Sequence, residues 1–200
     1  MSVVIRKLFK FEGAHIVRNC SSYRCSHAIH GHSYKVEVFL TSNNLDNGQM
    51  VYDFGLLKGT VKDFIDSFDH ALMVWDKDEE LVEIAKKHSE RHIIIPFSPS
   101  AEAQAIAFAY IIDKILLHTK MVNSEGNVKV LKVRVHETDT GWAEAEPNDI
   151  KLLPEFDINK IEFSEAIKRE WKDYRFWDKL LNAIKNGQIA FENQKPEKQI

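Results

Sequence analysis

The order in which two kinds of periodicity occur along the chain most constrains its fold. Residues 3–12 and 32–41 alternate apolar and polar side chains, which predicts two consecutive strands. Two segments with apolar residues at helical spacing follow, and Asp53 and Ser100 are suitable N-caps for them. The later alternating segments are 127–137 and 141–145. The order strand–strand–helix–helix–strand–strand predicts an α+β fold rather than a βαβ repeat.

A change in composition near Pro147 predicts a C-terminal extension. Apolar residues at helical spacing predict one helix there, closed by Gly187. They are Phe163, Ile167, Trp171, Tyr174, Trp177, Leu181 and Ile184. We therefore expect a main domain at 1–147, a helical extension at 148–187 and a disordered polar tail at 188–200.

Charge and composition exclude several classes of protein. The net charge of −3 offers no basic surface for duplex nucleic acid, and no apolar run approaches the ~20 residues that cross a bilayer. The first residues lack the apolar stretch of a signal peptide, so we expect a cytoplasmic protein without nucleic-acid or membrane partners. Cys20 and Cys25, the two cysteines, are then free thiols rather than a disulfide scaffold.

Three histidines are placed to converge at one end of the predicted sheet. His30 and His32 are two residues apart and share the parity of the apolar side of their strand. His15 continues the parity of the first strand, beyond a loop expected over 13–31. If the strands pair as an antiparallel hairpin, three imidazoles form a metal site with one open position, for which Zn²⁺ is the default ion. The alternative is three half-buried histidines that hydrogen-bond to the backbone.

Other residues carry groups that can transfer protons. Cys25 lies close to His30, where a nearby cation lowers the pKa of a thiol, and Cys20 is the competing candidate. Asp69 and His70 are adjacent, and a carboxylate that orients an imidazole is typical of proton-transfer sites. The alternative for Cys25 is an inert, small apolar residue. The alternative for Asp69 and His70 is a pair that only caps the end of a helix.

Three further residues are candidates for binding a substrate. Glu137 extends the buried parity of its strand, and its carboxylate can accept two parallel hydrogen bonds from the amino-pyrimidinone edge of a pterin or guanine. Ser100 and Glu102 lie at a predicted helix N-terminus. The alternatives are a solvated Glu137 beyond the end of the strand and ordinary helix capping by Ser100 and Glu102.

Taken together, these residues resemble the 6-pyruvoyl-tetrahydropterin synthase / 6-carboxy-tetrahydropterin synthase family. The matching pieces are Phe11-Glu12-Gly13-Ala14-His15, Cys25, His30-Gly31-His32, Gln49-Met50-Val51-Tyr52-Asp53-Phe54, Asp69-His70, Pro99-Ser100-Ala101-Glu102 and Glu137-Thr138. The ordered set spans residues 3–146 and is far more specific than any single piece.

The resemblance implies a tunnelling fold, a four-stranded antiparallel sheet with two helices that assembles into a homohexamer of two trimers. It also implies roles for individual residues. The zinc ligands would be His15, His30 and His32, the proton-transfer residues would be Cys25, Asp69 and His70, and Glu137 would anchor the pterin. The substrate would be 7,8-dihydroneopterin triphosphate, from which triphosphate is eliminated.

The chain departs from the family pattern in three places. Cys25 precedes His30 by five positions rather than four, the linker over 71–98 is longer, and Ser100 replaces the usual threonine. Two activities share the scaffold. The compact Cys–His-Gly-His arrangement favours 6-carboxy-5,6,7,8-tetrahydropterin synthase, which also cleaves the side chain to acetaldehyde on the route to queuosine. The alternative is 6-pyruvoyl-tetrahydropterin synthase, and a more remote one is a non-catalytic metal- or pterin-binding module.

Overall fold

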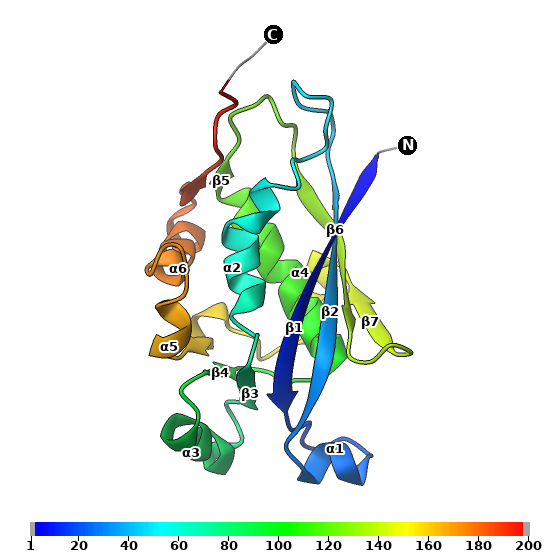
Figure 1. The fold of residues 1–200 in the computed structure, drawn as a ribbon, viewed down its shortest axis with the longest axis vertical. Coiled ribbons are helices and arrows are strands. Elements are labelled where there is room, and N and C mark those ends of the chain that lie inside the picture. The colour runs from blue at the N-terminus through cyan, green and yellow to red at the C-terminus, as the bar shows by residue number, and fades with distance from the viewer. Residues whose placement is uncertain (1–2, 198–200) are drawn as a thin grey trace.

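The computed structural model describes residues 3–197, and its centre is one large sheet (Figure 1). Its seven strands, in spatial order, are β7 (Trp142–Ala145), β6 (Lys129–His136), β2 (His30–Thr41), β1 (Val4–His15), β3 (Ala71–Trp75), β4 (His92–Ile95) and β8 (Glu162–Phe163). The four predicted strands form the antiparallel part, β7-β6-β2-β1. The short strands β3, β4 and β8 extend that sheet beyond the expected four.

Helices cover one face of this sheet and its lower end. The α-helices are α1 (Tyr23–His27), α2 (Thr60–Asp66), α3 (Glu79–His88), α4 (Ala101–Leu117), α5 (Glu165–Lys168) and α6 (Phe176–Asn186). The 3-10 helices are Leu56–Lys58, Pro147–Leu152 and Ile158–Lys160. Figure 1 shows α4 behind the long strands, α2 beside them, and α1 and α3 at the end where β1 stops. The α+β prediction is confirmed. No helix within residues 3–197 is long and apolar enough to cross a membrane.

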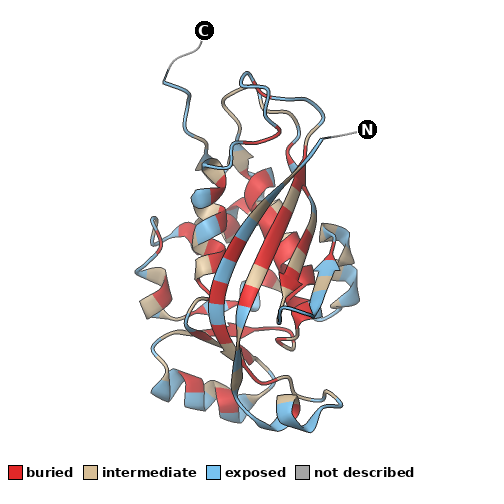
Figure 2. Cartoon of the chain, turned by 45° about the vertical axis from the view of Figure 1, so that its right-hand side comes forward, coloured by how far each residue is buried: buried red, intermediate tan, exposed pale blue. Residues whose placement is uncertain are grey.

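The core lies between the sheet and its helices because the strands bury alternate side chains. Tyr34, Val36, Val38 and Leu40 of β2 are all at most 1% exposed, as their parity predicts. The buried and exposed positions alternate along the strands in Figure 2. Because successive side chains leave opposite faces of a strand, this parity determines what lies on the same side as His30 and His32.

The two predicted helices form with different boundaries. Ser100 caps α4 as predicted, since its hydroxyl accepts a hydrogen bond from the Ala103 amide. The helix predicted from Asp53 is instead broken, and α2 begins only after Gly59. Asp53 is not its cap, because its carboxylate accepts from the amide of Gly55 within a turn. The loop expected over 13–31 is shorter, since β1 continues to His15 and α1 occupies part of the remainder.

The C-terminal segment packs onto the same core as the sheet. The single helix expected from 163 to 184 is two helices, α5 and α6, with a turn between them that leaves Tyr174 51% exposed. The predicted stop is confirmed, because Gly187 adopts a left-handed φ of 63° after α6. Trp171 donates a hydrogen bond of 2.8 Å to the Ser67 hydroxyl, which ties the extension to the end of α2.

The polar tail differs from the disorder expected over 188–200. β9 (Phe191–Glu192) pairs in parallel with β5 (Thr119–Lys120) after the end of α4. The last part of that prediction, 198–200, lies outside the described residues.

Candidate functional site

Three histidine side chains converge where β1 ends and β2 begins. His15 is the last residue of β1 and pairs with His30, the first residue of β2, while His32 pairs with Gly13. One ring nitrogen from each histidine lies within 4.8 Å of the other two. A Cβ added at Gly31 would lie 3.1 Å from the Gly13 carbonyl, so glycine allows the close approach of the strands here. The predicted convergence is therefore confirmed.

Backbone carbonyls orient two of the three rings. The Nδ1 of His15 lies 2.7 Å from the Pro99 carbonyl, and the Nδ1 of His30 lies 2.9 Å from the Ala28 carbonyl. A carbonyl can only accept, so we assign the proton to Nδ1 in both rings. The two Nε2 atoms, 3.1 Å apart, then present lone pairs to one another. A cation between them would stabilise this arrangement.

Burial favours the neutral form of the His15 and His32 imidazoles by lowering the pKa of each. It is the largest cause that lowers the pKa of His15 to about 4, and the nearby His30 and His32 lower that pKa further, against the opposing hydrogen bond to Pro99. Burial likewise lowers the pKa of His32, although Glu137 opposes the shift. Metal binding requires neutral imidazole, so the environment favours the ligating form.

The donor set fits a divalent metal ion. The Nε2 of His32 is buried without a hydrogen-bond partner among the described residues, which costs free energy unless another group pairs with it. Three imidazole nitrogens suit Zn²⁺ and other late divalent ions of the first transition series. The three histidines can therefore hold one metal ion through their Nε2 atoms.

The lowered pKa of His15 predicts a pH dependence of stability in the metal-free protein. Between pH 6.5 and about 4 the unfolded chain protonates this imidazole while the folded chain does not. The free energy of unfolding should therefore fall as the pH decreases through this window, by about 3 kcal/mol from this residue. Urea unfolding of metal-free wild type and His15→Asn at several pH values tests this. Equal pH dependence of the two proteins would contradict it.

Sequence reasoning missed the groups that support His15. Gln104 and Tyr34 are both at most 1% exposed. The Gln104 amide donates to the Pro99 carbonyl that also accepts from His15, and the Tyr34 hydroxyl lies 3.2 Å from His15 Nδ1. Burial raises the pKa of Tyr34, which keeps its hydroxyl protonated. The sequence does carry one signal for Gln104, because it is a polar side chain between alanines in a helix that is mostly apolar.

Asp69 and His70 form a hydrogen-bonded pair in a turn against β1. His70 Nδ1 lies 2.9 Å from the Asp69 carboxylate, whose other oxygen accepts from the Glu12 amide at 2.8 Å. Burial alone would raise the pKa of Asp69, but the hydrogen bonds from Glu12 and His70 outweigh it and hold this pKa below its usual value. His70 has a φ of 52°, a strained value for a residue other than glycine, and strain of this kind gathers at functional sites.

A shallow hollow of about 440 Å³ lies beside the ends of β1 and β2. Its lining includes His32, His70 and Glu12. The His70 side chain is 73% exposed, so its ring faces the solvent side of this hollow rather than the core. Glu12 and Ser33, which also line the hollow, leave the face of the strands opposite to the histidine rings, so within one chain the pair and the three imidazoles are neighbours in the fold but do not face one another.

The two cysteines are not part of the metal-sized group. Cys25 lies on α1 with a half-buried thiol, and its carbonyl accepts from the Val17 amide, which ties α1 to the chain just after His15. The Cys20 thiol donates to the Ser22 carbonyl at 3.4 Å, within its own turn. Cys25 is thus close to His30 in sequence, and its backbone is hydrogen-bonded to the segment that follows His15. The Cys20 thiol is instead hydrogen-bonded within its own turn.

Glu137 lies against the histidines. Its Oε1 is 3.6 Å from His15 Nε2 and 3.9 Å from His32 Nε2. Ser100 and Glu102 begin α4 directly after Pro99, so they lie close in sequence to the carbonyl that orients His15. Glu102 is exposed in the first turn of α4.

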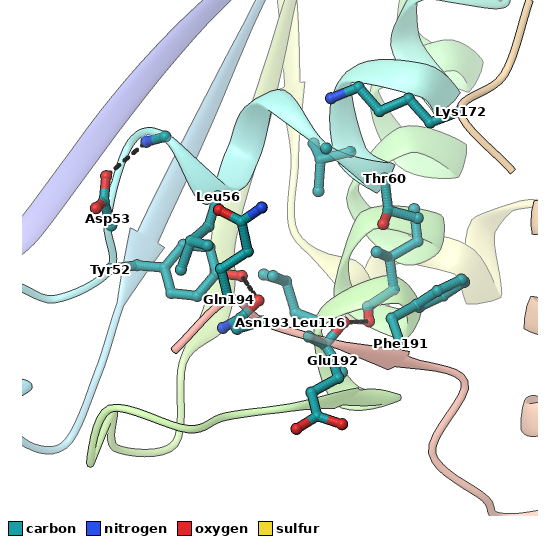
Figure 3. A pocket seen from close by; sticks show the side chains of 15 residues that line it. Tyr52, Asp53, Leu56, Thr60, Leu116, Lys172, Phe191, Glu192, Asn193 and Gln194 are labelled. Carbon is teal, nitrogen blue, oxygen red and sulfur yellow. Dashed lines mark hydrogen bonds between the residues drawn. The ribbon is translucent and has the colours of Figure 1, made fainter. Parts of the chain in front are cut away.

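A second hollow, of about 430 Å³, lies away from these residues (Figure 3). It forms where β9 crosses α2 and the end of α4, and the Tyr52 hydroxyl donates to Asn193 at its wall. Its lining contains none of the predicted site residues. The histidine surface is therefore the candidate site.

Comparison with known proteins places this geometry in context. The family model described as 6-pyruvoyl tetrahydropterin synthase matches residues 4–148. The chain is 42% identical to the 6-carboxy-5,6,7,8-tetrahydropterin synthase of Helicobacter pylori (strain J99), over 99% of this chain and 100% of that protein. It is 33% identical to the enzyme of the same name from Aquifex aeolicus, over 70% of this chain and 95% of that protein.

Solved structures share the fold. An uncharacterized protein from Wolinella succinogenes superposes with a TM-score of 0.59 and 24% identity, over 73% of this chain and 98% of that one. The 6-pyruvoyl tetrahydropterin synthase of Caenorhabditis elegans superposes with a TM-score of 0.51 and 20% identity, over 73% of this chain and 96% of that one. The tunnelling fold is therefore confirmed.

Proposed function

Because the chain belongs to the 6-pyruvoyl tetrahydropterin synthase family, we propose that it is a zinc-dependent 6-carboxy-5,6,7,8-tetrahydropterin synthase. The substrate is 7,8-dihydroneopterin triphosphate. The reaction eliminates triphosphate and, with uptake of one water molecule, cleaves the side chain to release acetaldehyde, a step toward queuosine in the cytoplasm. The observation that carries the proposal is the group of three imidazoles that can hold a metal ion, with the hydrogen-bonded Asp69–His70 pair in the turn against β1. Full-length similarity to Helicobacter pylori proteins of that name supports it.

The three histidines hold the metal ion in this proposal. When bound, the ion polarises the oxygens of the substrate side chain and thereby makes the adjacent C–H bonds more acidic. His15 is held by its hydrogen bond to the Pro99 carbonyl, whereas His32 has an Nε2 atom without a partner among the described residues.

The remaining predicted residues move protons and orient the pterin. Cys25 acts as the base that removes a proton from the substrate side chain. Asp69 fixes the tautomer of His70, so that the exposed ring nitrogen exchanges a second proton as triphosphate leaves. Glu137 accepts two hydrogen bonds from the amino-pyrimidinone edge of the pterin, with Ser100 and Glu102 as further binding groups.

The proposed assembly is a homohexamer of two trimers. β1 pairs with β3 only at 13–15, so the edge of its earlier residues has no strand partner within the described chain. Exposed strand edges favour pairing with another copy. We therefore expect a closed oligomer of six chains in sedimentation velocity, and a stable monomer at micromolar concentration would contradict the assembly.

Product analysis tests the proposed activity. Purified metal-loaded protein, incubated with 7,8-dihydroneopterin triphosphate, should yield 6-carboxytetrahydropterin, acetaldehyde and triphosphate by mass spectrometry. The description of the matching family model favours one second candidate, 6-pyruvoyl-tetrahydropterin synthase, which eliminates triphosphate only. Accumulation of the 6-pyruvoyl product without acetaldehyde would establish that alternative, and no turnover would exclude both.

A further inference from the structure

The position of Glu137 is not explained by the contacts that usually hold a carboxylate. Its Oε1 lies 3.6 Å from His15 Nε2 and 3.9 Å from His32 Nε2, and both distances exceed the 2.7–3.2 Å of an N–H···O hydrogen bond. His15 Nε2 in turn lies 3.1 Å from His30 Nε2. The Glu137 carboxylate thus lies beside two of the three imidazole nitrogens without a direct hydrogen bond to either, just outside the group of three histidines whose ligand atoms all lie within 4.8 Å of one another.

The separations of Glu137 from His15 and His32 are near those of ligands on one ion. A tetrahedral ion with bonds of ~2.1 Å places its ligand atoms ~3.4 Å apart. The distances of 3.6 and 3.9 Å are slightly longer than that value, so a small movement of the Glu137 side chain would bring its carboxylate to an ion held by the histidines. The Glu137 side chain is 32% exposed, so it reaches the histidines from the open side of the site, where the three-histidine set leaves a position free.

We propose that Glu137 is the fourth ligand of the metal ion in the substrate-free protein and that a bound pterin displaces it. The inference deepens the proposed function, on which it rests. Glu137 then has two positions, one on the metal ion and one on the amino-pyrimidinone edge of the pterin.

The two positions couple recognition to the opening of the metal site. A carboxylate bound to a cation cannot accept the two hydrogen bonds of the pterin edge at the same time. Arrival of the pterin competes for this carboxylate and frees a coordination position for the oxygens of the substrate side chain. Without a pterin, the fourth ligand excludes water and other anions from the ion.

Metal binding without substrate tests the proposal directly. Protein loaded with Co²⁺ reports its coordination in the visible spectrum, and competition with a chromophoric chelator gives the affinity for Zn²⁺. We expect Glu137→Gln and Glu137→Ala to alter the Co²⁺ spectrum and to weaken Zn²⁺ binding by about tenfold or more, because even groups behind the ligands contribute about 10–100-fold. Asp139→Asn is the matched control, since Asp139 is an exposed carboxylate on the same hairpin that pairs with Lys35.

The outcomes separate this proposal from the proposed function. If both Glu137 variants keep the wild-type spectrum and affinity while wild type turns over 7,8-dihydroneopterin triphosphate, the fourth-ligand assignment is wrong and the enzyme assignment stands. If wild type binds no metal ion, both are wrong. Neopterin added to Co²⁺-loaded wild type should change its spectrum, and bound neopterin with an unchanged spectrum would overturn the displacement.

Discussion

His32→Ala is expected to lose the metal ion and all metal-dependent turnover while it remains folded. Two imidazoles and the Glu137 carboxylate remain in this variant, and Glu137 is not held to a hydrogen-bond partner in the cluster, so the remaining groups bind the ion too weakly to retain it through purification. The Nε2 of the removed ring has no hydrogen-bond partner within the described residues, so its loss leaves no buried group without a hydrogen bond there. The sheet should therefore persist.

Elemental analysis and circular dichroism check this expectation. Wild type should carry about one divalent ion per chain, and His32→Ala close to none, with an unchanged far-ultraviolet spectrum. His88→Ala is the control, because His88 ends α3 and is exposed. Full metal occupancy in His32→Ala would refute the ligand assignment.

Cys25→Ala is expected to lower turnover by ~10²–10⁴-fold, the usual contribution of a general base, while metal and pterin binding persist. The variant keeps all three histidines and Glu137, so both binding functions should survive. Cys20→Ala should retain near-normal turnover, because the Cys20 thiol is engaged within its own turn. Steady-state rates, together with neopterin binding and metal content for each variant, check this.

The reverse result would move the role to the other thiol. An inactive Cys20→Ala with a near-normal Cys25→Ala would assign the base to Cys20, five residues earlier. Near-normal rates in both variants would mean that the base is a different residue.

Local periodicity determined much of this protein. The two-residue alternation in β1 and β2 predicted their buried faces and, on condition that the two strands pair as an antiparallel hairpin, the convergence of His15, His30 and His32. It succeeded because alternation dictates which side chains share a face, whatever packs against that face. Helix capping is equally local, and it correctly placed the start of α4 and the stop at Gly187.

Other features depended on how distant segments pack. The carbonyl that orients His15 belongs to Pro99, 84 residues later in the chain, and Glu137 reaches the cluster from the far side of β2. Periodicity did not reveal the short strand β3, whose few residues pair with the end of β1.

In the C-terminal extension, too, the sequence predicted local helical structure but not the contacts between distant segments. Its helical spacing predicted one helix, but the turn between α5 and α6 brings Trp171 to Ser67 and Trp177 over Phe64. The sequence by itself determined which residues are apolar and which faces they share. The tertiary structure alone decided which faces meet, because contacts between distant segments depend on the path of the whole chain and the free energy gained by burying both surfaces together.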